Sequence, residues 1–97
     1  MPVIFDNDDR RYLDWLSSHR KGYVVNTLRG YSPRYMLLHR ATCHWISQLK
    51  SPARAGGFTE RALVKICADT VEELHQWCRR HGSENGTFSS RCPTCKP

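Results

Sequence analysis

The sequence predicts a small α+β domain: a three-stranded antiparallel sheet flanked by two helices, in the order α-β-β-β-α, with a cysteine-containing C-terminal tail. Two segments carry apolar side chains at helical spacing, and three short segments between them are rich in β-branched and aromatic residues. Glycine and proline separate these segments. The 97 residues suit one domain, which we expect over residues 1–82, with residues 83–97 as the tail.

Both predicted helices have capping residues at their starts. The first is expected over residues 6–19, with Asp6 or Asn7 as its cap, and the second begins after Asp69 or Thr70 and ends at Gly82. Thr70 and Glu73 have the spacing of a capping box, in which each side chain accepts from the other's backbone N–H. The apolar face of the first helix comprises Tyr12, Trp15, Leu16 and His19.

The three strands are expected over residues 22–28, 35–40 and 60–68. The first two form a hairpin, because residues 29–34 contain a glycine and a proline. Residues 44–48 fit a strand or a turn. Residues 50–59 have two glycines and no periodicity, which is typical of a loop.

The net charge of +6 is concentrated in the middle of the chain. Residues 15–59 contain no acidic side chain, so one face of the protein is expected to be basic. The basic residues of this stretch are Arg20, Lys21, Arg29, Arg34, Arg40, Lys50 and Arg54.

This basic stretch, interleaved with aromatic residues, predicts a nucleic-acid-binding module. DNA is favoured because the aromatic motif of common RNA-binding domains is missing. The alternatives are a basic face that is merely solvated and a face that binds an acidic protein. The predicted phosphate contacts are Arg20, Arg29, Arg34, Arg40, Lys50 and Arg54, and the predicted stacking or base-edge contacts are Tyr31, His39 and Trp45.

The C-terminal cysteines indicate a structural zinc site. Cys78 and His81 lie three residues apart on the predicted second helix, and Cys92 and Cys95 form a Cys-x-x-Cys pair in the tail. Four such ligands close a tetrahedral site and would tie down the tail. Alternatively, Cys78 is a core residue, and the tail cysteines are free thiols or a redox pair. Cys43, Cys67 and His39 also fit as core residues.

Two short triplets resemble the GIY-YIG nucleases. Gly22-Tyr23-Val24 stands at the start of the first strand, and Tyr35-Met36-Leu37 at the start of the second. The second triplet lacks its glycine, and the next acidic residue is Glu60. The resemblance implies a metal-dependent nuclease as an alternative, while no Ser-His-Asp, paired-carboxylate or P-loop pattern assigns a catalytic residue. A zinc-stabilised protein-interaction or inhibitor domain is a further alternative.

The phrase GYVVNT…YMLLHRATC is similar to small uncharacterised bacterial domains that carry a VVNT strand followed by LHRA-x-C. The likeness spans about residues 12–78 and implies a bacterial, intracellular setting. No run of about 18 apolar residues is present, so no membrane span is expected. The N-terminus turns acidic within six residues and does not resemble a signal peptide, so a cytoplasmic protein is expected.

Overall fold

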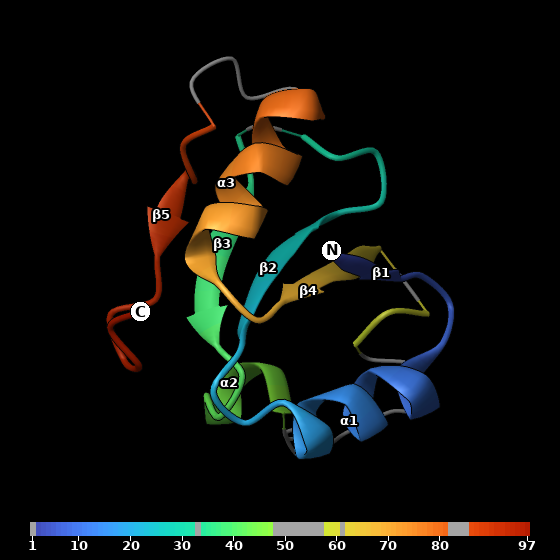
Figure 1. Cartoon of the computed structure of the whole chain (residues 1–97). Coiled ribbons are helices and arrows are strands. Elements are labelled where there is room, and N and C mark those ends of the chain that lie inside the picture. Colours follow the sequence, from blue (N-terminus) through green and yellow to red (C-terminus); the bar gives the residue numbers. More distant parts are fainter. Residues whose placement is uncertain (1, 33, 48–57, 61, 82–85) are drawn as a thin grey trace.

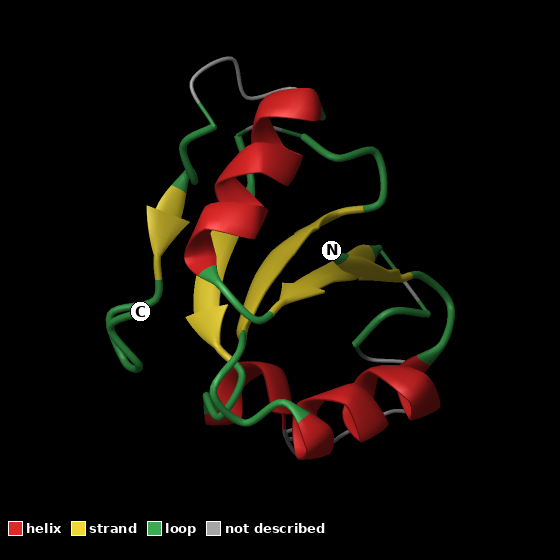
Figure 2. Cartoon of the chain, in the orientation of Figure 1, coloured by secondary structure: helices red, strands yellow, loops and turns green. Residues whose placement is uncertain are grey.

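The structure of this chain is a computed structural model that describes residues 2–32, 34–47, 58–60, 62–81 and 86–97. It has a mixed α+β fold in which helices cover both faces of one five-stranded sheet (Figure 1, Figure 2). In chain order the elements are β1 (Val3–Phe5), α1 (Asp9–Ser18), β2 (Tyr23–Leu28), β3 (Met36–Arg40), α2 (His44–Ser47), β4 (Leu63–Ala68), α3 (Val71–Arg80) and β5 (Ser90–Arg91).

The sheet has five strands in the order β1-β4-β2-β3-β5, whereas the sequence predicts three. The three predicted strands form its antiparallel centre, and Val24 of β2 lies between His39 of β3 and Cys67 of β4. The missed strands lie at the two edges: β1 pairs antiparallel with β4, and β5 pairs parallel with β3. Both are short and are ordered by pairing with a long neighbour rather than by a pattern of their own.

The helix boundaries differ from the expected ones at the start of α1. Its cap is Asp8 rather than Asp6 or Asn7, and the Asp8 carboxylate accepts from the Arg11 N–H at 3.1 Å. Asn7 adopts a left-handed backbone conformation with φ of 59°. By contrast, Thr70, one of the two predicted caps of α3, is its cap and accepts from the Glu73 N–H at 3.2 Å. The expectation of a strand or a turn over residues 44–48 was wrong, because His44–Ser47 form the short helix α2, while Gln48 lies outside the described residues.

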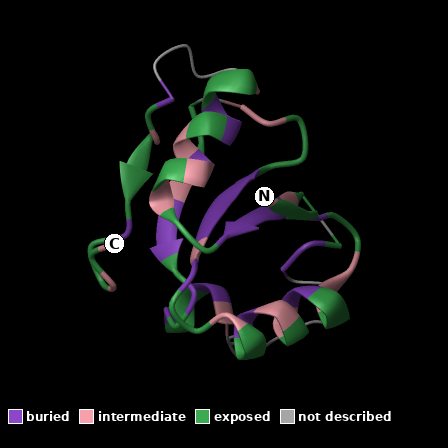
Figure 3. Cartoon of the chain, in the orientation of Figure 1, coloured by how far each residue is buried: buried purple, intermediate pink, exposed green. Residues whose placement is uncertain are grey.

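Each face of the sheet has its own core, because side chains alternate along every strand. On one face, α1 and α2 pack over Val24 and Cys67 with buried Tyr12, Leu16 and Ile46. On the other face, α3 packs through its buried side chains over β2, β3 and β4. These three strands are coloured mostly as buried in Figure 3. The buried residues of this second core include Val25, Met36, Leu38, Ile66, Leu74, Trp77 and Cys78.

Two polar residues interrupt the apolar pattern of the central strands and satisfy each other. Lys65 of β4 is 2% exposed, and its ammonium donates to the Asn26 side-chain oxygen at 2.8 Å and to the Phe58 carbonyl at 2.7 Å. The two residues are cross-strand partners on the face covered by α1. Buried polar groups are tolerated when paired in this way.

None of the helices in the described part of the chain has the length and apolar run that crossing a bilayer requires.

Candidate metal centre

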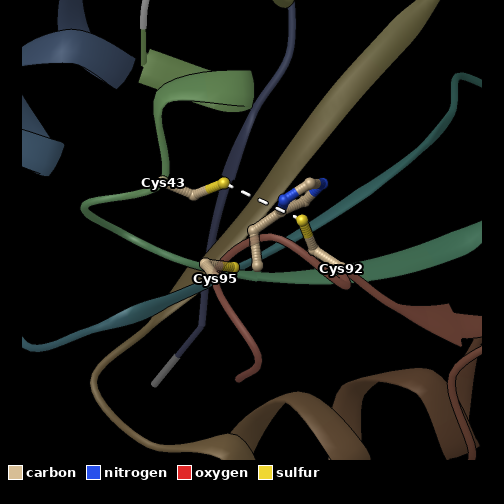
Figure 4. Close-up of side chains that lie close together, drawn as sticks. Cys43, Cys92 and Cys95 are labelled. Atoms are coloured by element: carbon tan, nitrogen blue, oxygen red, sulfur yellow. Dashed lines mark hydrogen bonds between the residues drawn. The ribbon is translucent and has the colours of Figure 1, made fainter.

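One histidine and three cysteines from distant parts of the chain meet at the C-terminal ends of the neighbouring strands β3 and β5. Their ligand atoms, one from each of His39, Cys43, Cys92 and Cys95, all lie within 4.8 Å of one another. Figure 4 shows the three cysteine side chains turned toward a common point. All five cysteines of the chain are free thiols. This cluster can hold a metal ion.

The first pair of ligands comes from β3 and the turn that follows it. His39 is the next-to-last residue of β3, and its side chain points to the α1 face because its cross-strand partner Val24 does. After β3, the Cys43 N–H donates to the Arg40 carbonyl at 3.0 Å, closing a tight turn. Cys43 then immediately precedes α2, whose Ser47 hydroxyl donates to the Cys43 carbonyl at 2.8 Å.

The second pair lies in the turn after β5. The Cys92 N–H extends the β3–β5 pairing by donating to the Leu38 carbonyl at 2.9 Å, which places Cys92 beside β3. The Lys96 N–H donates back to the Cys92 carbonyl at 3.0 Å, and Lys96 itself has a positive φ of 49°. This tight turn brings the Cys95 sulfur toward that of Cys92.

Arg40 fastens this turn to the end of β3. Its backbone N–H donates to the Cys95 sulfur at 3.2 Å. Its guanidinium donates to the Cys95 carbonyl at 2.9 Å and to the Lys96 carbonyl at 3.1 Å. These three hydrogen bonds hold the Cys95 part of the turn against the end of β3.

The two buried sulfurs differ in their tendency to ionise. Burial raises the pKa of the Cys43 thiol to about 12. Burial acts in the same direction on Cys92, but backbone N–H groups of Cys95 and Thr94 donate to its sulfur, and the net shift of its pKa is downward. A bound cation would favour the thiolate at each position, because a coordinated thiol loses its proton.

His39 has the protonation state that a ligand requires. Burial, followed by the nearby Lys65 ammonium, lowers the pKa of His39 to about 4, so the imidazole is neutral at pH 7. The side chain is 3% exposed, and among the described residues its Nδ1 atom has no hydrogen-bond partner. A buried ring nitrogen without a partner costs free energy, and coordination to a cation would satisfy it.

The predicted set of zinc ligands is only half retained. Cys92 and Cys95 belong to the cluster, but Cys78 and His81 do not. Cys78 is fully buried in the core beneath α3, on the opposite face of the sheet from His39. His81 stacks on Trp77 with ring centroids 4.3 Å apart, and its Nδ1 lies 2.9 Å from the Trp77 carbonyl. The alternative that Cys78 is a core residue therefore describes its position.

The sequence predicts a base contact or a core position for His39 and a core position for Cys43, and the structure brings the two side chains together as candidate metal ligands. The spacing His-x3-Cys was visible, but His39 and Arg40 alone did not indicate which strand face meets the tail. The structure supplies this information, because the exposed Arg40 leaves the neighbouring His39 side chain pointing inward.

Among the described residues, the predicted phosphate contacts lie in separate parts of the fold. Arg29 forms an ion pair with Asp6 and donates to the Thr59 carbonyl at 2.9 Å. Arg40 holds the C-terminal turn, as described above. Arg20 and Arg34 are exposed at opposite ends of the β2–β3 hairpin. Lys50 and Arg54 lie outside the described residues.

The predicted aromatic contacts also separate. Tyr31 is half-buried against Trp77 and His81, with ring centroids 5.2 and 5.7 Å away. His39 is buried in the cluster of candidate metal ligands. Trp45 alone of the three is well exposed, at 45%.

The triplets that resemble the GIY-YIG nucleases stand at opposite ends of the hairpin. Tyr23 pairs with Arg40 at the last position of β3, whereas Tyr35 immediately precedes the first. The resemblance left the metal-binding carboxylate unassigned, and the next acidic residue, Glu60, accepts from the Asp9 N–H at the start of α1 at 2.9 Å. Comparison with known proteins adds no assignment: no family model, no curated protein and no solved structure matches this chain.

Proposed function

We propose that this chain is a zinc-binding domain in which His39, Cys43, Cys92 and Cys95 hold one Zn²⁺ ion in a structural role. The observation that carries the proposal is the meeting of these four ligand atoms within 4.8 Å. Three thiolates and one imidazole form a Cys₃His set, one of the common structural zinc sets. All four positions of a tetrahedron are then filled by protein, which leaves none for a catalytic water.

The distance between two of the three sulfur atoms supports zinc. The Cys43 and Cys92 sulfurs are 3.9 Å apart. A tetrahedral ion with zinc–sulfur bonds of about 2.3 Å separates neighbouring sulfurs by about 3.8 Å. Soft thiolates combined with imidazole also favour zinc over magnesium or calcium, which prefer oxygen ligands.

The role of the ion would be to join the end of the chain to the domain. The strand β5 has two exposed residues, and Cys92 is the buried side chain that follows it. A metal ion bound by Cys92 and Cys95 on one side and by His39 and Cys43 on the other links the tail to β3. Such binding contributes directly to folding free energy, because the unfolded chain has no preformed site.

We predict one zinc ion per chain in protein purified without chelator, measured by elemental analysis. Replacing a ligand by Cys92→Ala or His39→Ala should abolish stoichiometric zinc, because a three-ligand site binds more weakly. The matched control is Cys78→Ala, which removes an equally buried cysteine on the opposite face of the sheet and should keep the metal. Loss of zinc from folded Cys78→Ala, or its retention in both ligand variants, would contradict the proposal.

A second candidate function is nucleic-acid binding, with DNA as the favoured partner. The supporting observation is that, Lys65 aside, every Lys and Arg among the described residues has an exposed side chain. Together with the net charge of +6, this distribution favours attraction of a polyanion over long range.

This function predicts a salt-dependent affinity for DNA, measured by fluorescence anisotropy with labelled strands and duplexes. The plot of log affinity against log salt has a negative slope. The magnitude of this slope should decrease by about 0.9 for each duplex phosphate contact that is removed. We expect this reduction for Arg34→Ala at the hairpin and little change for Arg80→Ala at the exposed end of α3. An affinity that does not vary with salt, or no binding at low salt, would rule out this candidate.

A further inference from the structure

A cleft lies directly beside the metal cluster on the face of the sheet covered by α1 and α2. Its volume is about 340 Å³, at the lower end of the range of about 300–1,000 Å³ typical of small-molecule sites. The cleft shares His39 and Cys92 with the cluster. Residues from β2, β3, α2 and the C-terminal turn line it, so four separate segments converge there.

Two exposed aromatic side chains line this cleft. Tyr35 is 38% exposed and Trp45 is 45% exposed. Among the large hydrophobic residues of the described chain that are exposed, these two are aromatic. Trp45 is held in place, because its indole N–H donates to the Thr94 hydroxyl at 3.0 Å. An aromatic ring that is already oriented loses little conformational entropy when a flat ligand stacks on it.

A polar group is available among the apolar lining. Asn26 lines the cleft from β2 and is 8% exposed. The Lys65 ammonium donates to its side-chain oxygen, which fixes the orientation of the amide. The group that Asn26 then presents is an N–H donor, which suits a carbonyl oxygen or ring nitrogen at the edge of a heterocycle.

We propose that this cleft binds a nucleobase, presented either by a free nucleotide or by a single-stranded nucleic acid. The proposal rests on the proposed metal centre and deepens the proposed nucleic-acid binding by naming the form that is bound. A nucleobase has a flat π-face to stack on Trp45 and Tyr35 and a polar edge for Asn26. Its phosphate is attracted by a protein of net charge +6.

Duplex DNA does not satisfy these requirements. Its bases are stacked and paired inside the helix, and exposing a base face costs unstacking energy. A single strand or a free nucleotide presents the base without that cost. The cleft should therefore prefer single strands to duplexes of the same sequence.

The metal ion is expected to affect the cleft, because the ion would be bound by the C-terminal turn that forms one wall of the cleft. Cys92 and Thr94 both line it, and Thr94 also accepts the hydrogen bond that holds Trp45. Releasing the turn by removing the ion would remove this wall. Base binding is therefore expected to require the metal-loaded protein.

The test is isothermal titration of the full chain, zinc-loaded and zinc-depleted, with adenosine and uridine monophosphates, a short oligothymidylate and a duplex. Zinc-loaded protein should bind a monophosphate or the single strand more tightly than the duplex. Trp45→Ala should weaken this binding by about 10- to 100-fold, because base–aromatic stacking is lost. Trp45→Phe should recover most of it. Leu28→Ala, which removes a 39% exposed apolar side chain at the far end of β2, should have no effect.

The outcomes separate this inference from the functions on which it rests. Three results would overturn the proposed nucleobase site. They are no binding of any of these ligands by the zinc-loaded protein, a preference for the duplex, and unchanged binding in Trp45→Ala. Salt-dependent duplex binding alone would keep the nucleic-acid function and reject the nucleobase site. If the zinc-depleted protein binds the base as tightly as the zinc-loaded protein, and Trp45→Ala weakens this binding, then the nucleobase site stands and its dependence on the metal ion is rejected. Binding of the monophosphate without the strand, or the reverse, identifies the source of the base.

Discussion

Removal of the metal ion is expected to lower the thermal unfolding midpoint by on the order of 20 °C, measured by circular dichroism with and without a strong chelator. Free zinc at about 1,000 times its dissociation constant stabilises the folded state by about 4 kcal/mol. For a domain of about this size, each kcal/mol changes the midpoint by roughly 4–8 °C. The stabilisation is large because four ligands from two distant segments are joined by one ion.

The loss should be greatest at the end of the chain. Amide hydrogen exchange of Ser89 and Cys92, whose N–H groups donate to the Met36 and Leu38 carbonyls, should lose protection on chelation. Cys95→Ala should show the low midpoint with or without chelator, whereas Cys78→Ala should keep the difference between the two conditions. A midpoint that stays unchanged after zinc has been removed would show that the ion does not stabilise the fold.

The second large effect concerns the buried lysine of β4. We expect the free energy of unfolding to rise by about 3 kcal/mol between pH 8 and pH 10.5 because of Lys65, and this rise should be absent in Lys65→Met. Burial lowers the pKa of Lys65 from 10.5 to about 8, against the opposing influence of Asp9 and Cys67. Each pKa unit of difference between the unfolded and the folded state corresponds to about 1.4 kcal/mol in the free energy of unfolding.

The sign follows from the protons bound in each state. Between pH 8 and pH 10.5 the unfolded chain holds a proton on Lys65 that the folded chain has lost, so raising the pH favours folding. Below pH 8 both states are protonated and this contribution is constant. The ammonium is tolerated because it donates to Asn26 and Phe58 and lies 5.8 Å from the centre of the Tyr12 ring.

The measurement is urea unfolding of zinc-loaded protein at a series of pH values, with the variant subtracted from the wild type. Subtraction removes the contributions of titrating groups that do not interact with Lys65, and the difference reports Lys65 together with its coupled neighbour Cys67. Lys21→Met, which replaces an exposed lysine, is the control and should follow the wild type. Parallel curves for wild type and Lys65→Met across this range would contradict the assigned effect of burial.

Local sequence patterns predicted the centre of the fold. The hairpin and the cap of α3 depend on residues close together in the chain, such as Gly30 between the strands and Thr70 before the helix. The edge strands could not be predicted in this way. Val3–Phe5 and Ser90–Arg91 are too short to show alternation, and each becomes a strand by pairing with a distant neighbour, β4 or β3.

The same distinction explains the metal ligands. Cys92 and Cys95 are close in sequence, so their pairing is a local property of one turn. The other two ligands depend on which face of the sheet the tail reaches. Helical spacing made Cys78 and His81 equally plausible, but α3 uses Cys78 to pack on the opposite face. The parallel pairing of β5 with β3 brings the tail instead to His39 and Cys43.

The most direct test of the proposed ligand set is nuclear magnetic resonance of the protein with ¹¹³Cd in place of zinc. Cysteine and histidine ligands transmit scalar coupling to the bound cadmium, so a proton–cadmium correlation spectrum identifies each of them. We predict correlations to the β-protons of Cys43, Cys92 and Cys95 and to the imidazole ring of His39. Correlations to Cys78 or His81, or the absence of correlations to Cys43 and His39, would contradict the proposed ligand set.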